Sequence, residues 1–535
     1  MPALTLDHVS FAWPDGSVAL ADVSGTFGRG RTGLVGRNGS GKSTLLRLAA
    51  GELTPTSGRI VADGDVAYLP QRLAVDPARP VADLLGIAGP LAAVRAIEAG
   101  DVDPAHFDAV GDDWDVEARG RAALAEAGLP GDALDRTVGM LSGGEAVLAA
   151  LTGIRLRGAA ITLLDEPTNN LDRDARLRLH DIVRGWRGAL VVVSHDTELL
   201  ELMDDTAELY ADELTVFGGP YSQWRSWLDA EQDAAAQAER DAERALRREK
   251  RQRIEAEVKL ARRARTARRA EAEKRVPRIV AHGRRMAAEV SAGRLGVEMR
   301  EKESSARDAL DAAGLRVRDD DAIRIDLPDP GVPATRRIAT LRDAERSWVV
   351  QGPERVALTG PNGAGKSTLL RALVGAGGGP ALGAVGGTLH VDHAAYLPQR
   401  VDDLDDDASV LDAVRASAPH TPDRELRNRL ARFLLRGAVV DRSVGSLSGG
   451  ERFRVALARL LLADPPPPLL VLDEPTNDLD IDTVAQLLDA LRAYRGAVLV
   501  VSHDDAFLAR LDPDLVLELR DGVLAERELA PVNGA

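Results

Sequence analysis

One eight-residue pattern, Gly-x-x-x-x-Gly-Lys-Ser, occurs twice in this chain, at residues 36–43 and 360–367. In a phosphate-binding loop of this kind, the glycines let backbone amides close around phosphate oxygens between a strand and a helix. The lysine reaches the β- and γ-phosphates, and the serine hydroxyl binds Mg²⁺. Each copy therefore predicts one nucleotide site, and the duplication indicates that a pair of such domains is the working unit.

Continuous aliphatic runs mark the strands of both halves. The segments Ala189–Val193, Leu469–Leu472 and Ala497–Val501 are typical of parallel strands that are buried on both faces. A chain of 535 residues also exceeds the usual size of one domain. We therefore predict an α/β fold with two P-loop domains, each built on a parallel sheet.

The domain boundaries follow from the motifs and from a change in composition. We expect the first P-loop domain at residues 1–228, a basic helical linker at 229–321 and the second P-loop domain at 322–535. The first copy is about twenty residues longer between its Gln71 and Ser142 than the second copy is over the matching stretch. We expect this insertion within Val81–Trp114.

The linker sequence predicts an antiparallel helical hairpin. Residues 229–275 are rich in Ala, Glu, Arg and Lys and contain neither Gly nor Pro, which favours a helix about 70 Å long. We expect Pro277 to end this helix, Gly283 to lie in the turn, and a second helix to return from Arg285 to Ala313, with Gly293 and Gly296 weakening its middle. The thin apolar stripe expected to meet the second helix comprises Leu246, Ile254, Val258 and Ala261. A solvated charged coil is the alternative.

The charge of the chain is distributed unevenly. The net charge is −16, yet residues 240–302 contain 21 Lys or Arg against 10 Asp or Glu. A basic segment on an acidic protein suits binding to RNA phosphates. Because residues 230–322 lack aromatic side chains, base stacking is not the expected mode of binding.

The composition excludes several classes of site. With no cysteine, the chain cannot form disulfides, iron–sulfur clusters or cysteine-ligated zinc sites, and its nine histidines show no paired metal-ligand spacing. No stretch approaches 18 uninterrupted apolar residues, and the N-terminal residues lack a secretory signal pattern. We therefore expect no membrane segment and a cytoplasmic location.

Two apolar strands end in a pair of acids. These are Leu163-Leu164-Asp165-Glu166 and Val471-Leu472-Asp473-Glu474. We expect the first acid of each pair to bind Mg²⁺ and the second to orient or deprotonate the attacking water. Acids at strand ends often serve only as helix caps or surface charges, but their place beside a phosphate loop favours the catalytic role.

A third repeated motif is Leu-Ser-Gly-Gly-Glu, at residues 141–145 and 447–451. A serine followed by two glycines at a helix start presents a hydroxyl and backbone amides to an anion. With this motif, residues 4–228 and 322–525 resemble the ATP-binding cassette superfamily. The same resemblance identifies 68–71 and 396–399 as Q-loops, 170–172 and 478–480 as D-loops, and His195 and His503 as switch histidines. It implies that each signature serine completes the ATP site of the other half: Ser448 with Lys42, and Ser142 with Lys366.

These motifs give the expected site residues. The catalytic set comprises Glu166, Glu474, His195, His503, Gln71 and Gln399. The Mg²⁺ ligands expected are Ser43, Gln71, Asp165, Ser367, Gln399 and Asp473. The nucleotide-binding set comprises Trp13, Gly36, Asn38, Gly39, Gly41, Lys42, Ser43, Thr44, Ser142, Gly143, Gly144, Gly360, Asn362, Gly363, Gly365, Lys366, Ser367, Thr368, Ser448, Gly449 and Gly450. The Ser-His-Asp segments are not read as hydrolase triads, because adjacent residues do not converge as nucleophile, base and orienter.

Within this superfamily the chain resembles the ABC-F proteins. The features that carry the resemblance are the tandem cassettes, the charged helical linker, the segments 166–169 and 474–477 (Glu-Pro-Thr-Asn) and Pro277-Arg278-Ile279-Val280 at the linker bend. The resemblance implies a monomer that pairs its own cassettes around ATP and Mg²⁺. It also implies that the linker approaches ribosomal RNA and tRNA near the peptidyl-transferase centre, in translation or in ribosome protection from antibiotics.

Three features depart from a symmetric pair. Trp13 could stack on adenine, whereas the stretch near Leu327, taken as its counterpart, has no aromatic residue. The first signature continues Glu145-Ala146-Val147 and the second Glu451-Arg452-Phe453-Arg454, so we expect unequal sites. The insertion is too short to predict a large ribosome-contacting arm. Two other functions remain open: the ATPase subunit of a membrane transporter whose spanning part is a separate chain, and a DNA-associated ATPase.

Overall fold

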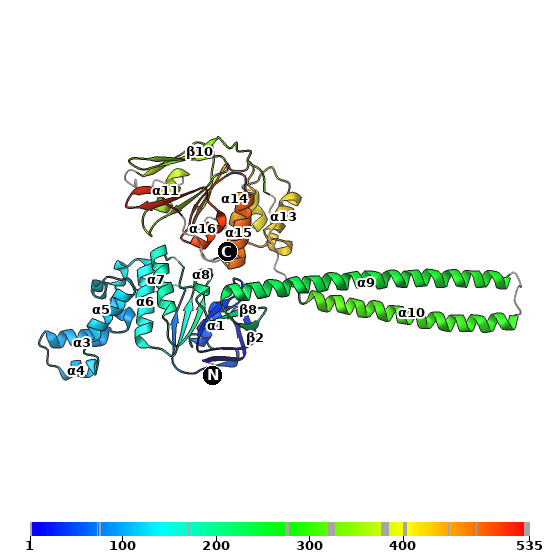
Figure 1. Ribbon diagram of the computed structural model, residues 1–535, viewed down its shortest axis with the longest axis horizontal. Coiled ribbons are helices and arrows are strands. Elements are labelled where there is room, and N and C mark those ends of the chain that lie inside the picture. The colour runs from blue at the N-terminus through cyan, green and yellow to red at the C-terminus, as the bar shows by residue number, and fades with distance from the viewer. Residues whose placement is uncertain are drawn as a thin grey trace. The chain divides into compact units, whose positions relative to one another are not determined.

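The computed structural model describes two compact units (Figure 1). The larger unit joins Met1–Tyr221 with Ala322–Ala535, and the smaller unit is Ser222–Asp321. The described residues are 3–71, 73, 76–169, 171–272, 278–318, 327–375, 385–399, 404–447, 449–477 and 479–528. Pro277 and Ser448, which were assigned roles from the sequence, lie outside these residues. Below, the first half means residues 3–221 and the second half means residues 327–528.

Two sheets form the frame of the first half. A six-stranded sheet has the order β5-β6-β7-β3-β8-β9, and a smaller antiparallel sheet has the order β2-β1-β4. The pairs β5–β6, β6–β7, β3–β7 and β3–β8 are parallel, and only the edge pair β8–β9 among those of the larger sheet is antiparallel. The strands are β1 Leu4–Ala12, β2 Val18–Phe27, β3 Arg31–Val35, β4 Ser57–Ala62, β5 Val66–Leu69, β6 Ile161–Asp165, β7 Ala189–Val193, β8 Asp205–Tyr210 and β9 Glu213–Gly218.

The helices of the first half connect these strands. They are α1 Lys42–Ala49, α2 Val81–Leu85, α3 Ala88–Glu98, α4 Pro104–Val110, α5 Val116–Glu126, α6 Gly143–Arg157, α7 Arg173–Arg184 and α8 Thr197–Leu200, with short 3-10 turns at Gly131–Asp135 and Val138–Met140.

The second half repeats the same topology. Its larger sheet has the order β14-β15-β16-β12-β17-β18 and its smaller sheet the order β11-β10-β13. The strands are β10 Arg337–Arg342, β11 Ser347–Gln351, β12 Arg355–Thr359, β13 Gly386–Leu389, β14 Ala395–Leu397, β15 Leu469–Asp473, β16 Ala497–Val501, β17 Leu515–Arg520 and β18 Val523–Glu526. The helices are α11 Lys366–Leu373, α12 Val410–Arg415, α13 Asp423–Arg432, α14 Gly449–Leu461, α15 Ile481–Ala493 and α16 Asp505–Leu511, with 3-10 turns at Gly437–Asp441 and Val444–Ser446.

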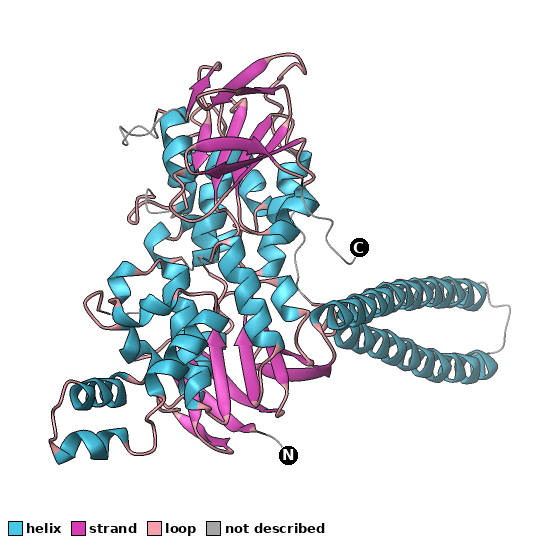
Figure 2. Ribbon diagram, turned by 60° about the vertical axis from the view of Figure 1, so that its left-hand side comes forward, coloured by secondary structure: helices cyan, strands magenta, loops and turns pink. Residues whose placement is uncertain are grey.

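The predicted fold class is confirmed. Every residue of β7, β15 and β16 is buried, as the continuous aliphatic runs predicted for central parallel strands. Figure 2 shows the strands of each half gathered together, with helices packed around them. In both halves, the phosphate loop follows one strand of the larger sheet, and the two acids end another strand of the same sheet. The sheet therefore brings these distant motifs to one edge.

The insertion in the first half forms two helices. Copy one has α2, α3, α4 and α5 between its Q-loop and its signature motif, where copy two has α12 and α13. The extra pair, α3 and α4, lies within the predicted range Val81–Trp114. The ring of Phe107, within α4, lies 6.0 Å from the ring of Trp114, and both side chains are exposed.

The smaller unit is the predicted antiparallel hairpin of two helices (Figure 1). Helix α9 spans Tyr221–Ala272 and helix α10 spans Arg278–Gly314. The Arg318 amide donates to Gln232 Oε1 at 2.8 Å, and farther along the hairpin Arg253 forms an ion pair with Glu303. From the first contact to the second, the residue number rises along α9 and falls along the second arm of the hairpin, from Arg318 to Glu303. The two helices are therefore antiparallel.

Two details of the linker prediction were wrong. Gly283 lies inside α10 and not in a turn, because the helix begins at Arg278, seven residues before the expected start. In the predicted apolar stripe, Ile254 is 48% exposed and Val258 is 61% exposed. Ala261 is also exposed, but Leu246 is partly buried, as are Ala242, Ala245, Ala256 and Leu260. The partly buried side chains of α9 thus include leucines as well as alanines, and the β-branched Ile254 and Val258 are exposed.

Candidate functional site

The two phosphate loops have matching backbone geometry. The first connects β3 to α1 and the second connects β12 to α11, so each lysine is the first residue of a helix. Gly36 has φ 149° and Gly360 has φ 136°, and a side chain at either would lie within 2.5 Å of a strand carbonyl, Leu209 O or Leu519 O. These glycines let the loop pass close to the neighbouring strand. The remaining glycines assigned to the loops are Gly39, Gly41, Gly363 and Gly365, all with positive φ.

Both loop lysines are buried and hold their own loops. Lys42 Nζ donates to the carbonyl oxygens of Gly36 at 2.6 Å and Arg37 at 2.9 Å. Lys366 Nζ donates to Gly360 O at 2.7 Å and also lies 3.0 Å from His503 Nε2. Burial lowers the pKa of both lysines, and nearby carboxylates such as Glu166 and Glu474 oppose this. Each ammonium is therefore a desolvated cation, which interacts strongly with an anion.

The first acid of each pair is held by a serine or a tyrosine. Asp165 accepts hydrogen bonds from Ser43 Oγ at 3.0 Å and from the Tyr68 hydroxyl at 3.2 Å. Asp473 accepts a bond from the Tyr396 hydroxyl at 3.2 Å. Burial raises the pKa of both aspartates, and the hydroxyl groups of the serine and tyrosine beside each one oppose this. The two tyrosines were missed as site residues, although each lies three residues before the Q-loop glutamine in both copies.

The oxygen ligands at these acids fit Mg²⁺. The Oδ1 atom of Asp473 is buried and has no hydrogen-bond partner, so it can bind a cation. Serine hydroxyls and single carboxylates are hard oxygen ligands, which Mg²⁺ prefers in combination with water and phosphate oxygens. Among the described residues, no cluster of three or more His, Asp or Glu could bind a metal by itself. One serine hydroxyl and one aspartate in each half form the donor set expected for a cation that binds together with nucleotide phosphates.

The second acids adopt an uncommon backbone conformation. Glu166 and Glu474 both have φ 49°, a region that non-glycine residues rarely occupy and that is enriched at functional sites. The His195 amide donates to Glu166 Oε2 at 3.3 Å, and the His503 amide donates to Glu474 Oε2 at 3.4 Å. The other carboxylate oxygen faces the histidine ring, with Nε2–Oε1 distances of 3.1 and 3.3 Å. Two motifs on adjacent strands thus form one carboxylate–imidazole pair in each half.

Burial sets the protonation of these pairs. It raises the pKa of Glu474 to about 7, although the charge of Lys366 lowers it. It lowers the pKa of His503 to about 3, and Lys366 acts in the same direction. The pKa of His195 is also lowered by burial and by Lys42. At neutral pH both rings are therefore uncharged, and Glu474 can accept a proton.

A cavity of about 350 Å³ lies at the first phosphate loop, within the size range of small-molecule sites. Among the residues lining it are Trp13, Asn38, Gly39, Gly41, Lys42, Ser43, Thr44, Gln71, Glu166 and His195. The Trp13 ring packs edge-on against Phe11, with centroids 5.0 Å apart, and lies 6.0 Å from the Arg47 guanidinium carbon. Trp13 therefore lies with the phosphate-loop residues at one cavity. In the second half, Thr368 follows Ser367 on α11, and Gln399 is exposed after β14.

The counterpart of Trp13 was misplaced in the sequence analysis. Trp13 follows β1 in the turn to β2, and the matching turn connects β10 to β11 at residues 343–346, well after Leu327. This turn, Asp343-Ala344-Glu345-Arg346, also lacks an aromatic residue. The nearby Trp348 is buried in β11 and donates to Glu526 at 2.9 Å. The correct alignment required strand order, which the motifs alone do not give.

The signature motifs open the helices α6 and α14. Ser142 caps α6: the Glu145 amide donates to its hydroxyl at 3.3 Å, and its own amide donates to Glu145 Oε2 at 2.7 Å. Gly143 and Gly144 form the first helical positions, as do Gly449 and Gly450 in α14. A methyl group on Gly450 would lie 4.0 Å from Asn38 Nδ2 of the first phosphate loop. Gly450 of the second signature thus lies near the first phosphate loop, while the pairing of Ser448 with Lys42 stays a prediction because Ser448 lies outside the described residues.

Each half also places a D-loop aspartate against the other half's phosphate loop. The Asn38 amide donates to Asp480 Oδ2 at 2.9 Å, and the Asn362 amide donates to Asp172 Oδ2 at 3.4 Å. Both aspartates also cap a helix, because Asp172 accepts from the Ala175 amide and Asp480 from the Thr483 amide. By contrast, a methyl group on Gly144 would meet Leu171 and Ala175 of its own half. Each phosphate loop therefore contacts a D-loop aspartate of the other half, and the first loop also lies near Gly450 of the second signature.

Known proteins share these features. The model of the ABC transporter family matches residues 20–169 and 345–477. The tylosin resistance ATP-binding protein TlrC of Streptomyces fradiae is 35% identical, over 96% of both chains. ATP-binding cassette sub-family F member 3 of Pongo abelii is 30% identical, over 92% of this chain and 67% of the relative. The chain belongs to the ABC-F family. It is accordingly an ATPase with tandem ATP-binding cassettes.

Solved structures agree with this fold. The RNase-L inhibitor covers 96% of this ABC-F chain with a TM-score of 0.54 at 19% identity, and the chain covers 87% of it. A model of ribosome-bound archaeal Pelota and ABCE1 gives a TM-score of 0.52, also at 19% identity, with 96% of this chain and 76% of that chain covered. At this identity the likeness shows the fold alone. In the described part of the ABC-F protein, no helix is both long and apolar enough to cross a membrane.

Proposed function

We propose that this ABC-F protein closes its two cassettes around ATP and Mg²⁺ and, in that form, binds the ribosome through its basic hairpin. There it would contact ribosomal RNA and tRNA, either in the regulation of translation or in antibiotic resistance by ribosome protection. One observation carries the proposal: each phosphate loop receives a D-loop aspartate from the other half, Asp480 at Asn38 and Asp172 at Asn362. A nucleotide in either loop would therefore contact both halves.

The residues of the second site have the properties that hydrolysis needs. Lys366, desolvated at the start of α11, would stabilise the phosphate charge, and Ser367 and Asp473 would hold Mg²⁺. Mg²⁺ with ATP would neutralise charge that develops on the phosphates. Glu474, with a pKa of about 7, would take the proton of the attacking water, and the uncharged His503 would hold the carboxylate in place. Lys42, Ser43, Asp165, Glu166 and His195 would serve the first site.

The hairpin supplies a surface for RNA. The stretch 240–302 has 21 basic against 10 acidic residues, and its arginines at 251, 262, 263 and 265 are exposed. Exposed cations of this density bind phosphate groups with strong salt dependence. The relative TlrC is named for tylosin resistance, and a protein of the same fold has been described in a ribosome-bound complex. These likenesses support the ribosome as partner and a cytoplasmic location. The presence of both cassettes in one chain supports a monomer as the working form.

A trap variant tests the proposal. Replacing both bases, Glu166→Gln with Glu474→Gln, removes the proton acceptors and leaves the ATP-binding residues in place. We expect ATP hydrolysis to fall at least about a hundredfold and the protein to sediment with ribosomes in a sucrose gradient only when ATP is present.

The control adds Lys42→Ala and Lys366→Ala, which should abolish ATP binding and, with it, ribosome association. Equal ribosome association with and without ATP would contradict the closure mechanism. Cofractionation with membranes, and not with ribosomes, would instead favour the transporter-subunit function.

A further inference from the structure

The side chains with which the first half contacts the second differ from the matched side chains with which the second half faces the first. Helix α7 begins Arg173-Asp174-Ala175-Arg176 after its cap Asp172, and helix α15 begins Ile481-Asp482-Thr483-Val484 after its cap Asp480. Because both helices start at an aspartate cap, the positions correspond one to one. Two arginines in the first half therefore stand where the second half has isoleucine and valine.

Arg173 forms an ion pair across the halves. Its Nε donates to Asp505 Oδ2 at 2.6 Å, and the aspartate side chain is only 22% exposed. Asp505 is the first residue of α16 and lies two residues after His503. In the reverse direction the matched residues are Ile481 and Thr197, which cannot form an ion pair. The charge contact thus reaches from the first half to the switch segment of the second site.

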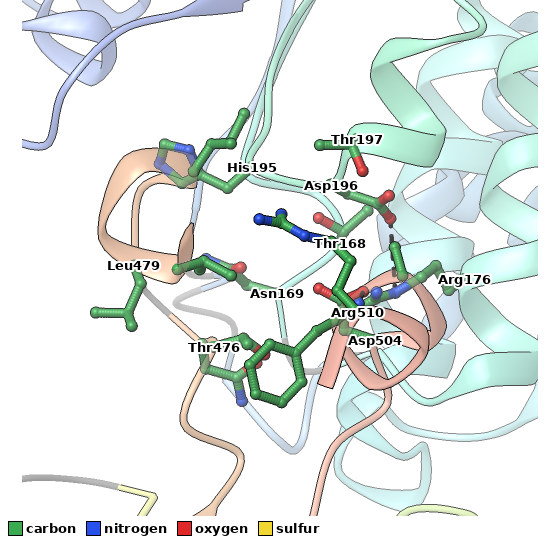
Figure 3. Close-up of a pocket in the computed structure, with 15 residues that line it drawn as sticks. Thr168, Asn169, Arg176, His195, Asp196, Thr197, Thr476, Leu479, Asp504 and Arg510 are labelled. Atoms are coloured by element: carbon green, nitrogen blue, oxygen red, sulfur yellow. Dashed lines mark hydrogen bonds and ion pairs between the residues drawn. The ribbon is translucent and has the colours of Figure 1, made fainter. Parts of the chain in front are cut away.

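Arg176 lies deeper in the same interface. Its side chain is 16% exposed, and its Nε lies 3.6 Å from Asp196 Oδ2, an oxygen that also lies 3.2 Å from His180 Nε2. Arg176, Asp196 and Asp504 line one pocket, to which the first half contributes the first two residues and the second half the third (Figure 3). Burial raises the pKa of Asp504, and the charge of Arg176 opposes this.

The arginines of the first half and the aspartates of the second half stabilise each other's buried charges. A buried guanidinium needs carboxylates around it, and a buried carboxylate needs a cation. The positive charge of Arg176 favours the ionised form of Asp504, which also caps α16 by accepting from the Phe507 amide at 2.9 Å. Separating the halves would leave Asp505 without Arg173 and would remove the charge of Arg176 from Asp504, whereas Arg176 would keep Asp196 of its own half. The segment His503-Asp504-Asp505 is therefore more strongly held when the first half is in contact.

We propose that Arg173 is a positioning residue of the second ATP site, acting from the first half through Asp505, which lies two residues after His503. The matched residues facing the first site, Ile481 and Thr197, are uncharged, so that site receives no such ion pair from the second half. Its Asp196 is paired by Arg176 of its own half instead. Hydrolysis at the second site thereby depends on charge contacts between the halves, whereas hydrolysis at the first site does not. This inference rests on the ATP-hydrolysis part of the proposed function.

The test replaces Arg173 with the residue that the second half uses at the matched position, Arg173→Ile, and leaves Arg176 in place because it pairs with Asp196 beside His195 of the first site. The change is made in two backgrounds: Glu166→Gln leaves the second site active, and Glu474→Gln leaves the first. We expect kcat in the Glu166→Gln background to fall about tenfold, the effect of roughly 1.4 kcal/mol at the transition state, with less than about a twofold change in the Glu474→Gln background. An equal loss in both backgrounds would overturn the inference.

A charge exchange separates positioning from a loss of folding. Arg173→Asp alone should lower second-site hydrolysis, and adding Asp505→Arg should restore most of it, because the ion pair is rebuilt with reversed charges. A lack of rescue in a variant that melts at the wild-type temperature would contradict the proposal. The matched control, Ile481→Ala with Val484→Ala, should leave second-site kcat within about twofold of its parent. All measurements are made without ribosomes, so they stand even if the ribosome proves not to be the partner.

Discussion

Tyr68 and Tyr396 hold the metal-binding aspartates in both halves through the same hydrogen bond, 3.2 Å long in each case. Burial raises the pKa of both phenols, so the hydroxyl stays protonated and remains a donor. Replacing each tyrosine by phenylalanine keeps the ring and removes the bond to a charged acceptor. We expect the Mg²⁺ concentration for half-maximal hydrolysis to rise roughly three- to tenfold, with a melting temperature within about 2 °C of wild type. An unchanged Mg²⁺ dependence in both variants would assign the tyrosines a packing role only.

At the scale of single residues, the motifs predicted the chemical role of each residue better than they predicted which residues contact it. Lys42 and Ser43 were found from the fixed spacing inside the phosphate loop, and Asp165 was found because an aspartate ends an apolar strand in both copies of the repeat. Tyr68 was missed because its contact arises from strand order: β5 and β6 are paired in the sheet, although about a hundred residues separate them. Arg176 was missed because its charged partners come from two halves. Neither contact leaves a pattern in the local sequence.

The hairpin shows the same difference for whole elements. Composition predicted two long helices correctly, because Ala, Glu, Arg and Lys all favour the helix. It misjudged the start of α10, since Gly283 reads as a turn residue but is accommodated within a helix. The predicted apolar stripe was right at Leu246 and wrong at Ile254 and Val258. These two were chosen for their hydrophobicity, but they are exposed, whereas Ala256 and Leu260 are partly buried. The choice between these faces depends on the partner helix.

Two glycines in α10 give a stability prediction for this element. A methyl group at Gly293 would meet no atom within 4 Å, and at Gly296 the nearest is an Arg300 guanidinium nitrogen at 3.8 Å. Alanine at both positions should therefore stabilise α10 by about 1 kcal/mol per site. Amide hydrogen exchange in the full-length protein should show several-fold greater protection around residues 290–300. The reverse change at an exposed helical position, Ala309→Gly, should reduce protection by a similar factor, and no difference between these variants would argue against an ordered α10.

At the scale of the whole molecule, the tandem cassettes could be predicted because each motif occurs twice in the sequence. The linker could be predicted because its composition differs from that of the cassettes. The inequality of the halves could be predicted only in part. The aromatic Trp13 and the different signature continuations are visible in the sequence, but the one-way ionic contact from α7 to α16 is not. It depends on which surfaces of the two halves face each other. A repeat in sequence therefore predicts two sites without predicting that they work alike.

We expect exposed arginines of the basic hairpin to hold the whole protein on RNA. Changing Arg262, Arg263 and Arg265 to glutamine removes three exposed charges from α9. If they contact phosphates, the slope of log K against log salt for ATP-dependent ribosome binding should fall by about 2, since each contact contributes roughly 0.7 to 0.9. The matched control, Arg187→Gln, Arg336→Gln and Arg424→Gln, removes three exposed charges from the cassettes and should leave the slope unchanged. ATP hydrolysis without ribosomes should be equal in the two triple variants. If both variants shift the slope equally, net charge and not the hairpin determines binding, and the proposed role of the hairpin fails.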